Sequence, residues 1–379
     1  MPKMAMTEME DTTFGKGTVF VLGAGFTKAF LSGAPLLVDD YYGAQLRAKF
    51  RDFPHACAIL DMELSQGSHP AGLIDLERLM TRLAAGMPYD QATGASHEFT
   101  LLLSELKQAF VRRLRAAKAE LTDSDRDLQV FAAHCIRHRI HCITFNYDDV
   151  LDRALWKQFP RYVPEAWCPD WGYGFPCQIS EACVRDVHTD FEPSSFAQEP
   201  ALSDDGTSPI FLLKLHGSVN WRIALGHAKP YAMEALRHHE DWFEHYGRVK
   251  INPDVLEPFL EPDPFFVPPI LTKTELVEQP ILRLVWSHAI QVLRAARRVV
   301  FMGYSLPVTD IAASFLFREG LGHVDARQYV RVVDYAEHEE GQRQKLSALL
   351  PAYRQVFASI TSDQFTFSGA RQWVTDSLT

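Results

Sequence analysis

The chain has 379 residues, of which 47% are hydrophobic and 23% charged, an ordinary composition for a globular protein. A formal net charge of −10 provides no overall positive field, so we expect no sequence-specific binding of nucleic acid. The longest apolar runs, such as Thr18–Leu22, are too short to span a bilayer. The first residues also lack the pattern of a secretory signal, so we expect a cytoplasmic protein with reduced cysteines and no membrane partner.

Helices and strands alternate along the predicted domain. We expect a mobile tail over residues 1–17 and one domain over residues 18–379. Short apolar runs predict strands at 18–22, 142–145, 210–215, 298–302 and 329–333. Apolar residues at helical spacing predict helices near 74–85, 99–121, 128–135, 148–157, 275–296 and 339–349. This alternation predicts a Rossmann-like, doubly wound α/β fold with a mostly parallel sheet.

Three segments interrupt the alternation and are interpreted as insertions. A helical insertion is predicted at about 39–140, a loop-rich one at about 160–208, and a mixed one with many prolines at about 222–268. The first contains His134 and His138 one helical turn apart, with two cysteines and a third histidine nearby. Because the helix is expected to end inside this group and the chain has no C-x-x-C pair, we expect no metal site.

A glycine-rich turn follows the first predicted strand. Gly23-Ala24-Gly25-Phe26-Thr27 ends that strand and precedes a candidate helix. Glycines at this position permit a tight turn and let backbone N–H groups approach a diphosphate. The full dinucleotide fingerprint is absent because Lys28 stands where the third glycine belongs. A purely structural turn explains the same residues, so both interpretations stay open.

Two further strand ends carry polar side chains suited to catalysis. Asn146 and Asp148 follow the second predicted strand, two residues apart, and extended backbone would point both to one side. His216 follows the third strand and is a candidate base near neutral pH. The alternatives are that Asn146 and Asp148 cap a helix, and that His216 is a structural histidine.

The last two predicted strands end in residues that suit a nucleotide. Gly303-Tyr304-Ser305 follows one strand, and the hydroxyl of Ser305 with nearby amides can hold ribose or phosphate. Asp334 follows the other, where an acidic residue often accepts a hydrogen bond from a ribose hydroxyl. A plain turn is the alternative for both segments.

The motifs as an ordered set resemble the sirtuin-like superfamily. The set comprises G-A-G-F-T at 23–27, T-F-N-Y-D at 144–148, L-H-G at 215–217 and G-Y-S-L at 303–306. It looks most like the zinc-less bacterial branch that hydrolyses NAD in defence against phage. Thr27 replaces the usual serine, Leu36 and Leu37 replace the Phe-Arg of true sirtuins, and the four-cysteine zinc ribbon is missing. These departures weaken an assignment as a deacetylase and leave NAD cleavage intact.

The resemblance implies a role for each motif. Asn146 and His216 would form the catalytic pair, with Asp148 shaping the nicotinamide side. The NAD-binding residues would be Gly23, Ala24, Gly25, Phe26, Thr27, Gly303, Ser305 and Asp334. NAD would be the substrate, cleaved to nicotinamide and ADP-ribose. The family also implies a homo-oligomer, sometimes partnered by a DNA-translocating ATPase or an Argonaute-type protein.

Other functions are compatible with the same residues. A non-catalytic module that binds NAD or ADP-ribose as a sensor or scaffold would use the same glycines without needing Asn146 and His216. Protein deacylation is less favoured because the zinc ribbon is missing. An oxidoreductase is favoured least because the glycine pattern fits it poorly.

Overall fold

The computed structural model describes residues 14–34, 43–66, 74–85, 87, 89–90, 94–118, 125–158, 167, 172–175, 210–221, 265–267, 279–307 and 310–379. Most of the predicted tail and most of the insertions at 160–208 and 222–268 lie outside these residues. Among the described residues, no helix has the length and apolar composition needed to cross a bilayer.

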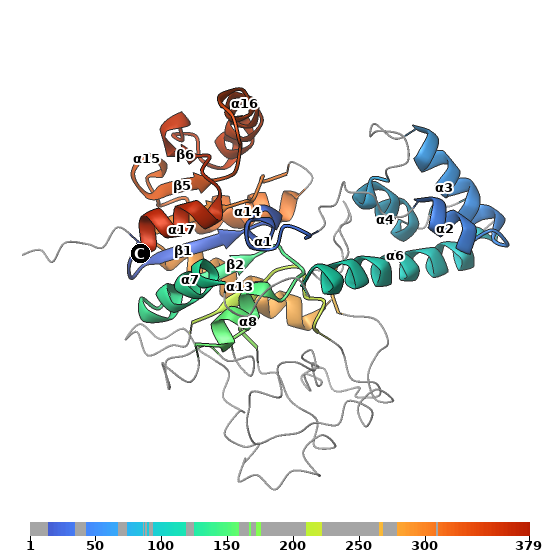
Figure 1. Cartoon of the computed structure of the whole chain (residues 1–379), viewed down its shortest axis with the longest axis horizontal. Helices are drawn as coiled ribbons and strands as arrows, with labels where there is room; N and C mark the ends of the chain where they lie inside the picture. The colour runs from blue at the N-terminus through green and yellow to red at the C-terminus, as the bar shows by residue number, and fades with distance from the viewer. Residues whose placement is uncertain are drawn as a thin grey trace, which may run out of the picture.

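The centre of the molecule is a six-stranded sheet in the order β3-β2-β1-β4-β5-β6 (Figure 1). Every pairing is parallel, which confirms the predicted Rossmann-like, doubly wound fold. All five residues of β1 are buried, as expected for a strand covered on both faces. The strands are β1 (Thr18–Leu22), β2 (His141–Thr144), β3 (Leu212–Lys214), β4 (Arg298–Met302), β5 (Val330–Val333) and β6 (Phe365–Thr366).

Helices cover both faces of this sheet. Phe20 of β1 packs on Phe131 of one helical layer, and Phe301 of β4 packs on Phe317 of the other. Phe20 pairs in register with Val300, so alternation along the strand directs Phe301 to the opposite face. The first layer contains α1 (Ala24–Phe30), α7 (Arg126–Arg137) and α17 (Ala370–Leu378), and the second contains α13 (Pro280–Ala295), α14 (Ile311–Gly320) and α16 (Glu339–Val356). Shorter helices lie at α8 (Val150–Trp156), α15 (Ala326–Tyr329) and η4 (Ser362–Gln364).

The helical insertion forms an arm beside the sheet (Figure 1). Its own apolar cluster includes Leu60, Leu79 and Leu106, which are fully buried and come from three different helices. The last helix of the predicted range, α7, packs on the sheet instead, through Phe131. The helices of the arm are α2 (Gly43–Lys49), α3 (Pro54–Gln66), α4 (Leu76–Ala84) and α6 (Ala95–Lys118).

Candidate active site

A cavity of about 330 Å³ opens at the carboxyl edge of the sheet, among the loops that follow β1, β2, β3 and β4. The chain runs outward from β1 in both directions, to β2 on one side and β4 on the other. This is the topological switch point, where open parallel sheets bind ligands. The sequence-predicted residues that line the cavity are Gly23, Ala24, Thr27, Asn146, Asp148, His216, Gly303 and Ser305.

The glycines let the turns after β1 and β4 touch. The Gly25 N–H donates to the Gly303 carbonyl at 2.9 Å, and the Gly23 N–H donates to the Met302 carbonyl at 3.0 Å. Gly303 has a φ of +60°, and a Cβ there would lie 2.3 Å from the backbone of Gly25 and Phe26. These amides are therefore engaged within the protein, which differs from the diphosphate contacts expected from the sequence. Gly25 and Phe26 do not line the cavity, and Phe26 lies in the core.

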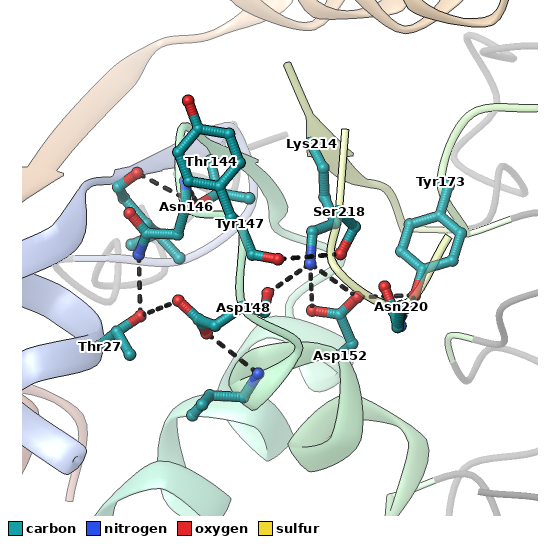
Figure 2. Close-up of polar contacts among 12 residues, drawn as sticks. Thr27, Thr144, Asn146, Tyr147, Asp148, Asp152, Tyr173, Lys214, Ser218 and Asn220 are labelled. Carbon is teal, nitrogen blue, oxygen red and sulfur yellow. Dashed lines mark hydrogen bonds and ion pairs between the residues drawn. The ribbon is translucent and has the colours of Figure 1, made fainter. Parts of the chain in front are cut away.

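A chain of hydrogen bonds fixes the asparagine (Figure 2). The Asn146 amide nitrogen donates to the Gly23 carbonyl at 2.8 Å and to Thr27 Oγ1 at 2.9 Å. Because a carbonyl only accepts, this contact sets the orientation of the amide. Thr27 then donates its own proton to Asp148 Oδ2 at 2.7 Å. Within the described residues, the Asn146 Oδ1 atom has no hydrogen-bond partner, so its acceptor capacity remains for a ligand.

The Asp148 carboxylate is the next member of this chain. Its Oδ1 accepts from the Val150 N–H at 3.1 Å, at the start of α8. Burial raises the pKa of this carboxyl, while the charge of Lys214 and the hydrogen bond from Thr27 oppose the rise. Asp148 therefore bonds to the first amide of α8, although the N-cap residue of that helix is Asp149, and it shares the hydroxyl of Thr27 with Asn146.

His216 sits against the same loop that carries Asn146. Its ring lies 5.3 Å from the Phe145 ring and 6.0 Å from the Tyr147 ring, measured between centroids. The imidazole is 5% exposed and lines the cavity. The structure therefore brings Asn146 and His216 to one cavity beside the turn at Gly23, although 70 positions separate them in the sequence.

The loops after β2 and β3 are joined by several hydrogen bonds. The Leu215 N–H donates to the Thr144 carbonyl at 3.0 Å. The Tyr147 carbonyl accepts from Ser218 Oγ at 3.2 Å and from the next amide, that of Val219, at 2.9 Å. These contacts place the asparagine and histidine loops in a fixed relation.

Lys214, the last residue of β3, links this strand to the loop after β2 and to α8 (Figure 2). It does not line the cavity, so its side of the loop is here called the closed side. Its ammonium donates to the Asp148 carbonyl and to both oxygens of Asp152, at 3.1 and 3.0 Å. Asp152 also accepts from the Tyr173 hydroxyl at 2.6 Å. Lys214 is 0% exposed, and burial raises the pKa of the Asp152 carboxyl against the opposing charge of Lys214. Nothing in the sequence indicates this contact beyond a lysine inside an apolar strand.

The helical arm supplies one wall of the cavity. Glu77 of α4 and Phe110 and Leu114 of α6 line it, and none of them was predicted. Phe110 packs on Tyr147 with ring centroids 5.3 Å apart, so the arm also contacts the asparagine loop. Asp310, at the start of α14, lines the cavity as well. The signal for Asp310 was an aspartate before an apolar helical run, which also describes an ordinary helix cap.

The remaining predicted residues are placed as follows. Ser305 lines the cavity beside Leu306, a buried residue with a left-handed φ of +50°. Such backbone strain is typical of functional loops. Asp334 does not line the cavity; it accepts from the Lys345 ammonium at 2.5 Å and from the Tyr335 N–H at 2.6 Å.

The histidine and cysteine group near the end of α7 is not arranged around a metal position. His134 and His138 have ring centroids 4.4 Å apart, and His134 Nε2 bonds to the Phe14 carbonyl. The Cys135 and Cys142 sulfurs lie 3.8 Å apart in the core. Within the part of the chain that the structure describes, no group of three metal-ligating side chains is found.

Comparisons with known proteins give likenesses of structure alone. No family model and no curated protein matches the chain. A Sir2 homologue solved in complex with NAD is 14% identical, with 97% of this chain and 89% of that chain covered and a TM-score of 0.42. A mutant Sir2 homologue in complex with 2'-O-acetyl ADP ribose is 12% identical, with 99% and 95% covered and a TM-score of 0.41. A structure solved to study sirtuin substrate affinity is 13% identical, with 99% and 98% covered and a TM-score of 0.38.

Proposed function

We propose that the protein is an NAD glycohydrolase, which cleaves NAD⁺ to nicotinamide and ADP-ribose. The observation that carries this proposal is the meeting of Asn146 and His216 in one cavity at the switch point of the sheet. The cavity volume lies within the range of small-molecule sites. An asparagine oxygen, a histidine and three carboxylates (Glu77, Asp148 and Asp310) suit the polar reaction of a nucleotide with water.

Departure of nicotinamide from NAD⁺ needs no strong acid catalyst. When the bond between ribose C1' and the nicotinamide nitrogen breaks, its electron pair goes to the ring nitrogen, and nicotinamide leaves as a neutral molecule. Positive character develops at C1', and nearby carboxylates such as Asp148 stabilise it. Water then forms the new C1'–O bond and gives up a proton.

In this mechanism Asn146 and His216 act on the water. The Asn146 Oδ1 atom accepts a hydrogen bond that orients the water, since the amide nitrogen is held by Gly23 and Thr27. His216 takes the proton as a general base, a contribution worth roughly 10²- to 10⁴-fold in rate. The fixed relation of the two loops holds both groups in position before the substrate arrives.

The decisive experiment compares nicotinamide release from NAD by the wild type, Asn146→Ala and His216→Ala. We expect both variants to lose at least about 100-fold in rate. His338→Ala is the matched control, because His338 is exposed at the start of α16, does not line the cavity and should keep the wild-type rate. Binding of NAD without cleavage by the wild type would favour the sensor or scaffold function. Cleavage that requires an acylated peptide would favour deacylation.

We further propose that the enzyme serves as the NAD-depleting effector of an anti-phage defence system. The support is the resemblance of its motifs to that branch. An enzyme that empties a cell of NAD must stay silent until triggered, so we propose activation by self-assembly or by a partner such as an ATPase or an Argonaute-type protein. The proposed contact surfaces are the helical insertion at about 39–140 and the segment 222–268, most of which lies outside the described residues. Light scattering that finds a monomer at every concentration, with no activation by any candidate partner, would contradict this role.

A further inference from the structure

Asp310 faces the histidine of the proposed site. Its Oδ2 lies 3.7 Å from His216 Nε2, within ion-pair distance. The two residues are 4% and 5% exposed, and both line the cavity. At this burial a carboxylate acts on an imidazolium with little screening by solvent.

The fold holds this carboxylate in place through its other oxygen. Asp310 is the N-cap of α14, and its Oδ1 accepts from the Ala313 N–H at 3.4 Å. Asparagine and serine cap helices about as well as aspartate does. Capping and the helix dipole account for a short acidic side chain at this position, but neither requires its second oxygen to lie beside His216.

Other titratable groups surround His216 less directly. Tyr147 stacks on its ring, and Glu77, Asp148 and Tyr304 line the same cavity. Lys214, two residues earlier in the chain, directs its ammonium to Asp152 and the Asp148 carbonyl. Among the described residues, Asp310 is the carboxylate that lies within ion-pair distance of the imidazole.

We propose that Asp310 is the positioning residue of His216, orienting its ring and stabilising the imidazolium formed during the reaction. The inference rests on the proposed function. As the water oxygen bonds to C1' and nicotinamide departs, the water proton moves to the neutral imidazole. The new positive charge then lies beside the Asp310 carboxylate. A buried aspartate supports a catalytic histidine in the same way in the Ser-His-Asp triad.

The test separates the charge of Asp310 from its capping role. Asp310→Asn keeps a capping side chain and removes the charge. An opposite charge at this distance shifts a pKa by about 1 to 3 units, so we expect the His216 pKa to fall by at least about 1 unit in the variant. The pKa is read from histidine ring signals in NMR titrations, with His216→Gln used to assign the signal. For the reaction we expect kcat to fall about 10- to 100-fold with little change in KM, and the acid limb of the pH–rate profile to move to lower pH.

Asp325→Asn is the matched control. Asp325 also caps a helix, accepting from the Arg327 N–H at 3.0 Å, and it does not line the cavity. Its substitution should change neither the His216 pKa nor kcat. Thermal melting of each variant confirms that it is folded.

The outcomes separate this inference from the proposed function. An unchanged His216 pKa in Asp310→Asn overturns the pairing, whether or not NAD is cleaved. A rise in KM at constant kcat, with no pKa change, also overturns it, because Asp310 would then bind substrate directly. A shifted His216 pKa in a protein that leaves NAD intact supports the pairing and removes the proposed function.

Discussion

The loop after β2 has two sides that differ in how fully their polar groups are used (Figure 2). On the closed side, the three N–H donors of Lys214 meet three oxygens, one from Asp148 and two from Asp152. On the cavity side, the Asn146 amide nitrogen donates to Gly23 and Thr27, and within the described residues its oxygen has no partner. Polar groups whose hydrogen-bonding capacity is fully used hold the loop in place. The Asn146 oxygen, whose capacity is not used, is the group that can act on a ligand.

The largest effect on stability is expected at Lys214. Lys214→Met leaves the Asp152 carboxylate buried without its cation, and breaking a buried pair in this way costs about 3–5 kcal/mol. The free energy of unfolding, measured by denaturant titration, should fall by that amount. This outcome would sharpen the contrast, since the cavity-side variants Asn146→Ala and His216→Ala should affect the rate far more than the stability.

The control for Lys214 removes both charges at once. In Lys214→Met with Asp152→Asn, no charge stays unpaired, and the asparagine oxygen can still accept from Tyr173. We expect this double variant to recover most of the lost stability. A loss of less than about 1 kcal/mol in the single variant would mean that the closed side does not hold the loop.

A second prediction concerns His141, at the start of β2. Its Nδ1 accepts from the Phe211 N–H at 3.0 Å, so this nitrogen's hydrogen-bonding capacity is used within the protein. Burial and the nearby His288 lower the pKa of His141 to about 4 in the folded protein, against 6.5 unperturbed. As the pH falls from 6.5 to 4, the unfolded chain takes up a proton that the folded protein excludes. Stability is therefore lost over this window, by at most about 3.4 kcal/mol, and the loss levels off below pH 4.

The measurement for His141 is a comparison of two stability curves. His141→Asn keeps an acceptor for the Phe211 amide and removes the titration. The wild type should lose more stability than the variant between pH 6.5 and pH 4, whatever their difference at pH 8. Parallel curves of unfolding free energy against pH would show that His141 is not held neutral in the folded protein.

The same contrast explains what the sequence could predict. The strands at 18–22 and 298–302 were predicted at their observed bounds because uninterrupted apolar runs mark strands buried on both faces. Asn146 and His216 were found because each follows such a run. In contrast, β6 has only two residues, too few for any periodicity, and was missed.

The parts of the site that were missed depend on long-range contacts. Glu77 and Phe110 lie on helices whose patterns predict only their own packing, and the arm reaches the cavity through the tertiary fold. Lys214 gave no local signal because its partner Asp152 lies on another element. Asp310 caps α14, and this local role explains its sequence context without indicating its second contact, with His216. A local pattern cannot distinguish one role from two.

The smallest predicted effect is at Thr27, a residue on the cavity side whose hydroxyl both accepts and donates a hydrogen bond. Thr27→Val removes the hydroxyl that accepts from Asn146 and donates to Asp148, while Asn146 keeps its bond to Gly23. We expect a loss of about 1 kcal/mol in unfolding free energy, as for one buried hydrogen bond, and a fall of about 10-fold in the rate of nicotinamide release. Because the lost hydrogen bond lowers the pKa of Asp148, that pKa should rise further. Thr27→Ser keeps the hydroxyl, and its rate of nicotinamide release should stay near that of the wild type. Equal rates for the valine and serine variants would mean that the hydrogen bonds of Thr27 do not hold Asn146 in position.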